Sequence, residues 1–162
     1  MHVLVSVASR HGATAEIGEA IALELARAGH FVDVIPPEDV DRVTKFDAVV
    51  LGSAVYVGRL AVSLRALVQR QAGELRERPV WLFWSGPVGD PPMPVTPPDD
   101  VAAIASATAA REARCFVGSL DRSGLGLSER ALVALTHAED GDFRDFDDVR
   151  AWAAAVAEGL AA

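Results

Sequence analysis

The chain has 162 residues and a formal net charge of −8 at pH 7, and 51% of its residues are hydrophobic against 23% charged. This length and composition predict a globular chain with a sizeable core, and we expect one domain over residues 1–162. The acidic balance argues against a protein that tracks nucleic-acid phosphates or an anionic membrane surface. We find no stretch that predicts a membrane span or a signal peptide, so we expect a cytoplasmic protein.

The first half of the chain alternates apolar runs with helical patterns. Residues 3–8 form a run, apolar except for Ser6, that predicts a buried strand, and apolar residues at helical spacing predict a helix over 14–28. Residues 30–35 alternate like a half-exposed strand, and 46–53 form another nearly continuous buried strand. One apolar stripe then predicts a helix over 60–72.

The second half continues the alternation. We expect a fourth strand over 79–85 and a fifth within 111–120, separated by an irregular stretch rich in proline and glycine over 85–100. An insert over about 119–141, with a short helix near 128–136, precedes a last helix that begins near Asp147. Continuous apolar strands separated by helices predict an α/β fold with a parallel sheet covered on both faces.

The chain contains one cysteine, Cys115, which cannot by itself form a disulfide framework or a cysteine-based metal cluster. It lies in the apolar run Cys115-Phe116-Val117. We therefore interpret Cys115 as a buried core thiol, and we predict no metal site.

A short polar turn joins the first strand to the first helix. Its members are Ser9, Arg10, His11, Gly12, Ala13 and Thr14. The start of a helix offers free N–H groups and a dipole that favours an anion, and glycine lets the backbone curl close to a ligand. This turn therefore suits a phosphate, although Ser9 or Thr14 could instead serve as an N-cap for the helix. It lacks the Walker sequence and the GxGxxG sequence.

Two further loops leave strands at the same edge, where open parallel sheets bind ligands. Residues 52–59 (GSAVYVGR) place Tyr56, whose ring can stack on a flat heterocycle, beside an open glycine backbone. Residues 84–90 (WSGPVGD) can offer backbone N–H groups to the edge of a ring. Alone, each loop is also explained by a tyrosine packing over a loop or by a glycine turn. Together the three loops indicate a mononucleotide that carries a flat redox-active ring.

These three segments resemble the flavin-binding loops of the flavodoxin-like family. SRHGAT resembles its phosphate loop, (S/T)-x-T-G-x-T, with His11 where the family has its middle threonine; DAVVLGSAVYVGR resembles its second loop, and SGPVGD its third. The resemblance implies a three-layer α/β sandwich with a five-stranded parallel sheet in the order 2-1-3-4-5 and helices on both faces. The insert and the closing motif are most similar to the branch that includes the menaquinone-dependent protoporphyrinogen oxidase.

The resemblance also implies FMN as the cofactor and assigns residues to it. The phosphate would be held by Ser9, Arg10, His11, Gly12, Ala13 and Thr14. One side of the flavin ring would be lined by Ala54, Val55, Tyr56, Val57 and Gly58. The other side would be lined by Ser85, Gly86, Pro87, Val88 and Gly89. No side chain is assigned a catalytic role, because the flavin itself supplies the redox chemistry.

Three functions follow as hypotheses. The first is an FMN-binding electron-transfer protein that serves a redox partner protein or a small-molecule donor or acceptor, with no nucleic acid and no integral membrane segment. The second is a flavoenzyme of the protoporphyrinogen oxidase type that passes electrons to a quinone. The insert is acidic on balance and has no aromatic residue, which argues against the membrane contact that this enzyme needs. The third is a binding or scaffold protein that has lost FMN.

Overall fold

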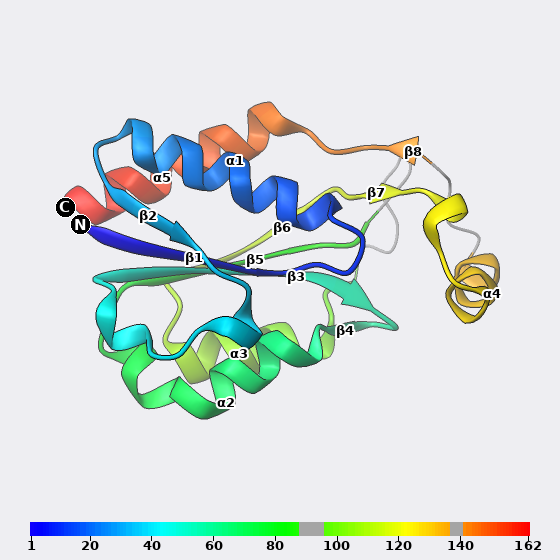
Figure 1. Ribbon diagram of the computed structural model, residues 1–162, viewed down its shortest axis with the longest axis horizontal. Helices are drawn as coiled ribbons and strands as arrows, with labels where there is room; N and C mark the ends of the chain where they lie inside the picture. The colour runs from blue at the N-terminus through cyan, green and yellow to red at the C-terminus, as the bar shows by residue number, and fades with distance from the viewer. Residues whose placement is uncertain (88–95, 137–140) are drawn as a thin grey trace.

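The computed structural model in Figure 1 describes residues 1–87, 96–136 and 141–162, and it has three layers. The central strands lie in the order β2-β1-β3-β5-β6, all parallel to their neighbours. Their bounds are His2–Ala8 (β1), Phe31–Val34 (β2), Ala48–Tyr56 (β3), Val80–Ser85 (β5) and Glu112–Phe116 (β6). This order is the predicted 2-1-3-4-5 arrangement of a flavodoxin-like α/β fold, which is therefore confirmed.

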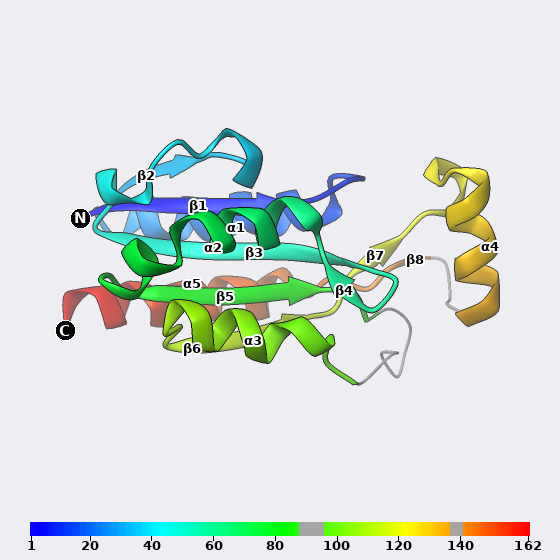
Figure 2. The ribbon, with the colours of Figure 1, turned by 90° about the horizontal axis from the view of Figure 1, so that it is seen from below.

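Helices cover both faces of the sheet, as the predicted sandwich requires (Figures 1 and 2). Helices α1 and α5 lie on one face, and α2 and α3 lie on the other. Their bounds are Ala13–Arg27 (α1), Val62–Arg76 (α2), Asp99–Thr108 (α3) and Phe146–Ala161 (α5). Helix α3, which we did not predict, begins directly after Pro98 and buries Val101 and Ile104 at helical spacing.

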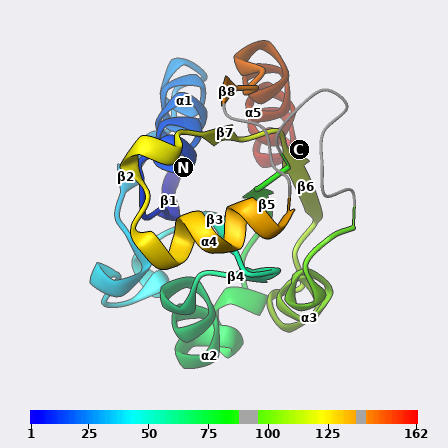
Figure 3. The same ribbon diagram turned by 90° about the vertical axis from the view of Figure 1, so that its right-hand side faces the viewer.

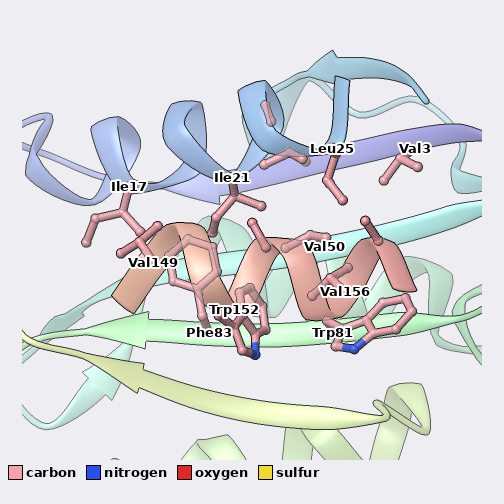
Figure 4. Packing of buried hydrophobic residues seen from close by; sticks show 14 of the residues in the cluster. Val3, Ile17, Ile21, Leu25, Val50, Trp81, Phe83, Val149, Trp152 and Val156 are labelled. Carbon is pink, nitrogen blue, oxygen red and sulfur yellow. The ribbon is translucent and has the colours of Figure 1, made fainter. Parts of the chain in front are cut away.

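The face beneath α1 and α5 holds an aromatic cluster (Figure 4). Phe83 of β5 meets Phe116 of β6 and Trp152 of α5, with ring centroids 5.7 Å and 6.1 Å apart and edge-to-face geometry. Gly52 of β3 lies directly beneath Phe83, because a Cβ at this position would come within 2.3 Å of the Phe83 ring. A strand residue without a side chain therefore makes room for a fully buried aromatic ring.

The start of α5 follows from its sequence. Asp145 lies just before the helix, and its carboxylate accepts hydrogen bonds from the backbone N–H groups of Asp147 and Asp148 at 3.0 and 3.1 Å. This is the usual way in which an aspartate N-cap satisfies the first free amides of a helix. Residues at helical spacing along α5 are buried against the sheet: Val149, Trp152, Ala153, Val156 and Leu160.

We expected Cys115 to be a buried core thiol, and this expectation is wrong. Cys115 lies on β6, which is an edge strand, and its side chain is only half-buried. Strands at the edge of a sheet are covered less completely than central strands, so an apolar run on such a strand does not guarantee a buried thiol. Partial burial still raises the pKa of the Cys115 thiol, which keeps it in the poorly reactive protonated form.

A small subdomain stands at the carboxyl edge of the sheet, within the stretch that we predicted as an insert. It contains the paired strands Ser119–Leu120 (β7) and Gly141–Asp142 (β8), a short 3-10 turn at Arg122–Gly124, and the helix Leu127–Thr136 (α4). Figure 3 shows α4 lying across the end of the sheet, whereas both chain termini lie at the opposite edge in Figure 1. Whatever binds at the carboxyl ends of the strands must therefore share this space with α4.

We predict that Gly52→Ala lowers the free energy of unfolding by about 1–3 kcal/mol, because the new methyl group must displace the Phe83 ring from a packed core. Urea unfolding followed by tryptophan fluorescence measures this loss. Gly73→Ala is the matched control: Gly73 lies on α2 with open space at its Cβ position, so the methyl group should be neutral or stabilise the helix by up to about 1 kcal/mol. Equal effects of the two substitutions would contradict the packing that we describe.

Candidate functional site

The predicted phosphate turn runs from the end of β1 at Ala8 to the start of α1 at Ala13. Gly12 precedes the helix with φ of 88°, a left-handed conformation that favours glycine. A Cβ placed on Gly12 would meet no atom within 4 Å, so this side of the turn is open. The Ser9 hydroxyl accepts the Gly12 N–H at 3.1 Å and thereby fixes the curl of the turn.

The first amides of α1 lack protein acceptors within the described residues. The first backbone hydrogen bond of the helix runs from Glu16 N to Gly12 O, so the N–H groups of Ala13, Thr14 and Ala15 come before it. No side chain caps the helix, which shows that the alternative of an N-cap by Ser9 or Thr14 is wrong. Ser9 is instead used within the turn, and Thr14 is already inside the helix with 4% of its surface exposed. An anion would satisfy the free amides.

Arg10 links the turn to the second predicted loop. Its backbone N–H donates to the Tyr56 hydroxyl at 2.6 Å, and its guanidinium carbon lies 4.4 Å from the centre of the Tyr56 ring. The cation and the aromatic face attract each other in this arrangement. One face of Tyr56, which we assigned to the flavin ring, is thus covered by Arg10 in this conformation.

Glu129 of α4 contacts both basic side chains of the turn. Its Oε1 lies 2.9 Å from Arg10 Nη1, and its Oε2 lies 2.7 Å from His11 Nε2. The hydrogen bonds from Arg10, and next from His11, lower the pKa of the Glu129 carboxyl, so it is ionised at neutral pH. Sequence reasoning missed this contact, because Glu129 counted only toward the acidic balance of the insert.

The second loop is a tight hairpin at the end of β3. Ala54, Val55 and Tyr56 continue the strand, and Val55 and Tyr56 pair with the short antiparallel strand Arg59–Leu60 (β4), which we did not predict. Val57 and Gly58 form the turn with φ of 51° and 71°. Such a conformation is unfavourable for a β-branched residue, and Val57 is also 78% exposed. Strain of this kind gathers at functional sites.

The third loop begins with Ser85, Gly86 and Pro87; its predicted members Val88 and Gly89 lie outside the described residues. Gly86 packs against the second loop so closely that a Cβ there would come within 2.9 Å of the Val55 Cβ. The Pro87 carbonyl accepts the Gly118 N–H at 2.7 Å, which ties this loop to the segment after β6. The three predicted loops therefore lie at one edge, and the second and third are in direct contact.

A pocket of about 500 Å³ opens beside Tyr56. Four of the predicted site residues line it, namely Ser9, Arg10, Tyr56 and Val57. Its other charged lining residues, which the sequence analysis did not single out, are Glu38, Arg59 and Arg65. Arg59 and Arg65 lie 3.6 and 3.7 Å from the buried Asp100 carboxylate, which also accepts the Leu60 N–H. The pocket thus has a cationic wall that is partly neutralised.

Two features are absent from the part of the chain that the structure describes. No grouping of three or more histidine, cysteine, aspartate or glutamate side chains there is arranged to hold a metal ion. None of its helices combines the length and the apolar character that crossing a bilayer requires.

Comparison with known proteins identifies the architecture. A family model described as a flavodoxin domain matches residues 4–147. The fold is similar to a flavodoxin from the domain Archaea, with a TM-score of 0.71 and 15% identity over 100% of both chains. It is also similar to a mutant of flavodoxin from Pseudomonas aeruginosa, with a TM-score of 0.65 and 15% identity over 100% of both chains.

A larger enzyme contains a similar unit. Rubredoxin oxygen:oxidoreductase from the anaerobe Desulfovibrio gigas aligns with a TM-score of 0.70 and 12% identity over 98% of this chain but only 36% of its own. No curated protein sequence matches the chain. At these identities the structural similarities establish the fold and leave the ligand to be inferred from the site.

Tyr56 offers a spectroscopic test of the site, because it is the only tyrosine of the chain. Burial raises the pKa of the Tyr56 phenol more than the Arg10 N–H and guanidinium lower it. We predict that its phenolate absorbance appears at higher pH than in the urea-unfolded protein. The contribution of Tyr56 to the free energy of unfolding is then fully present below the pKa of the phenol in the unfolded protein. It is lost as the pH rises through the higher pKa of the phenol in the folded protein. Tyr56→Phe supplies the baseline, and equal midpoints in the folded and unfolded protein would contradict the burial.

Proposed function

The chain belongs to the flavodoxin-domain family, and from this premise we propose that it binds FMN and transfers electrons through it. The observation that carries the proposal is the open start of α1, where three N–H groups without described acceptors follow a left-handed glycine. A helix start of this kind suits the phosphate of a mononucleotide. It lies at the sheet edge where doubly wound folds bind their ligands.

The residues of the turn fit a phosphate group. The N–H groups of Ala13, Thr14 and Ala15 and the Thr14 hydroxyl would donate to its oxygens, and no described residue accepts from any of them. Arg10 and His11 lie in the same turn and would add positive charge. His11, in place of the threonine of the family pattern, exchanges a hydroxyl donor for an imidazole that also carries charge when protonated.

The flavin ring would lie against the second and third loops. Ala54 to Gly58 would line one side and Ser85 to Gly89 the other, as the resemblance implies. Tyr56 is the one aromatic side chain among these residues, and its ring would stack on the flavin once Arg10 turns toward the phosphate. The backbone of Ser85, Gly86 and Pro87 would offer its polar groups to the ring edge.

Bound FMN supplies one- and two-electron redox chemistry, and the chain supplies binding, orientation and electrostatics. The proposal needs no acid, base or nucleophile from the protein. The electron donor or acceptor would be a redox partner protein or a small molecule that reaches the exposed loops. Val57 at the tip of the second loop is a large apolar residue that is 78% exposed at this edge.

One observation favours an enzyme as a second candidate. The pocket beside Tyr56 is lined by Arg10, Arg59 and Arg65, and it could receive an acidic substrate next to the proposed flavin site. Oxidation of protoporphyrinogen with a menaquinone acceptor tests this candidate directly. A rate no higher than that of free FMN would reject it and leave electron transfer.

We predict that the protein binds FMN and that Thr14→Ala weakens the binding by about 1–3 kcal/mol, because one hydrogen bond to a charged phosphate is lost. Quenching of FMN fluorescence during titration measures the affinity. Thr14→Ser keeps the hydroxyl and should bind like the wild type, which separates the lost donor from a packing defect.

The same titration decides between the proposal and the loss of FMN. If the folded wild-type protein leaves FMN fluorescence unchanged, the fold has lost its cofactor and both redox functions are rejected. If FMN binds but Thr14→Ala has the wild-type affinity, the phosphate lies elsewhere on the molecule.

A further inference from the structure

We propose that Glu129 is a latch that occupies the place of the cofactor phosphate. In the cofactor-free protein its carboxylate holds α4 across the phosphate turn, and the phosphate of FMN displaces it and frees α4. This inference rests on the proposed function and adds a way in which access to the site is controlled.

The geometry of the contact resembles that of a bound anion. One carboxylate reaches two basic groups of the turn, with Oε1 2.9 Å from Arg10 Nη1 and Oε2 2.7 Å from His11 Nε2. A phosphate presents oxygens to the same donors. A carboxylate and a phosphate at the same donors repel each other, so the two anions compete for Arg10 and His11.

The phosphate has the advantage in this competition. Glu129 contacts only side chains of the turn, whereas a phosphate would also take the free amides at the start of α1 and the Thr14 hydroxyl. The latch itself is weak, because the Arg10, His11 and Glu129 side chains are 55%, 41% and 26% exposed and water screens their attraction. A ligand that brings additional hydrogen bonds can therefore break it.

Glu129 joins helix α4 to the phosphate turn, with Arg10 and His11 as its partners. Leu127, at the start of α4, is 87% exposed. Figures 1 and 2 both show α4 standing apart from the helical layers, at the end of the β7–β8 stem. The Glu129 contacts thus help to hold α4 over the sheet edge.

The stem is anchored separately from the latch. Arg144 contacts the Ala13 carbonyl, the Glu16 carboxylate and Asp142, and its side chain is only 11% exposed. The Phe143 N–H donates to the Gly118 carbonyl at 3.1 Å. These bonds join β8 to the start of α1 and to the segment after β6. Release of Glu129 would therefore free α4 while the stem remains attached.

The first test compares FMN with riboflavin, which has the same ring but no phosphate. We expect Glu129→Gln to tighten FMN binding about 2- to 10-fold, in line with the weak exposed ion pairs that it removes, and to leave riboflavin binding unchanged. Glu19→Gln is the matched control, because it removes the same charge from an exposed position on α1 away from the turn. An unchanged ratio of the two affinities in Glu129→Gln, or the same change in Glu19→Gln, would overturn the latch.

The second test measures amide hydrogen exchange of residues 127–136. In the cofactor-free protein, the amides of residues 127–136 should exchange faster in Glu129→Gln than in the wild type. In Glu19→Gln they should exchange at the wild-type rate. Saturating FMN should speed exchange in the wild type, and riboflavin should not. If FMN binds but exchange of α4 is unchanged or slower, the inference fails and the proposed function stands. If neither flavin binds any variant, the proposed function fails. Displacement of Glu129 by the FMN phosphate then fails as well, whatever the rate of amide hydrogen exchange in Glu129→Gln.

Discussion

The parallel pairing of β1, β3 and β5 is the constraint on which the candidate site depends. The register places Ala8 beside Ser53 and Ala54 beside Ser85, so β1 and β5 end at nearly the same level of the sheet and β3 continues past them to Tyr56. Parallel strands cannot be joined by hairpins, and each must be followed by a crossover that starts at this edge. Three loops that are far apart in the sequence are thereby brought to one place before any ligand is present.

Polar contacts link the loops at the carboxyl edge of the sheet. Arg10 lies over Tyr56 and contacts Glu129, and Gly118 binds the Pro87 carbonyl. Each such contact is individually weak in water, in contrast to the aromatic cluster that fixes the sheet below. The molecule thus combines a rigid sheet with loops whose contacts can be replaced by those of a ligand. Lower local stability at the binding loops than in the core is expected for a binding protein.

The sequence predicts the frame well because its elements are specified locally. Nearly continuous apolar runs mark β1 and β5, and the helical spacing of Val149 and Trp152 marks α5. Cys115 shows the limit of this reasoning, since an apolar run does not reveal whether its strand lies at the centre or the edge of the sheet.

The site is predicted less completely, because its decisive contacts are not local. The turn from Ser9 to Thr14 was recognised from its residue types, but the choice of Gly12 as the cap position depends on backbone conformation. Glu129 is separated from His11 by 118 positions, and neither composition nor periodicity relates the two. The pocket wall formed by Arg59 and Arg65 likewise arises only when α2 is placed against the sheet.

The two chain termini lie together at the edge of the sheet opposite the candidate site. A surface linker attached at either end would therefore leave the three loops and α4 facing the solution. On a gold electrode, this orientation would hold the proposed flavin site away from the metal, so direct electron transfer from the electrode should be slow. Val57 is exposed, so it can be replaced by cysteine in a variant that lacks Cys115, and a linker can be attached there. This attachment would reverse the orientation of the molecule and place the proposed flavin site against the surface.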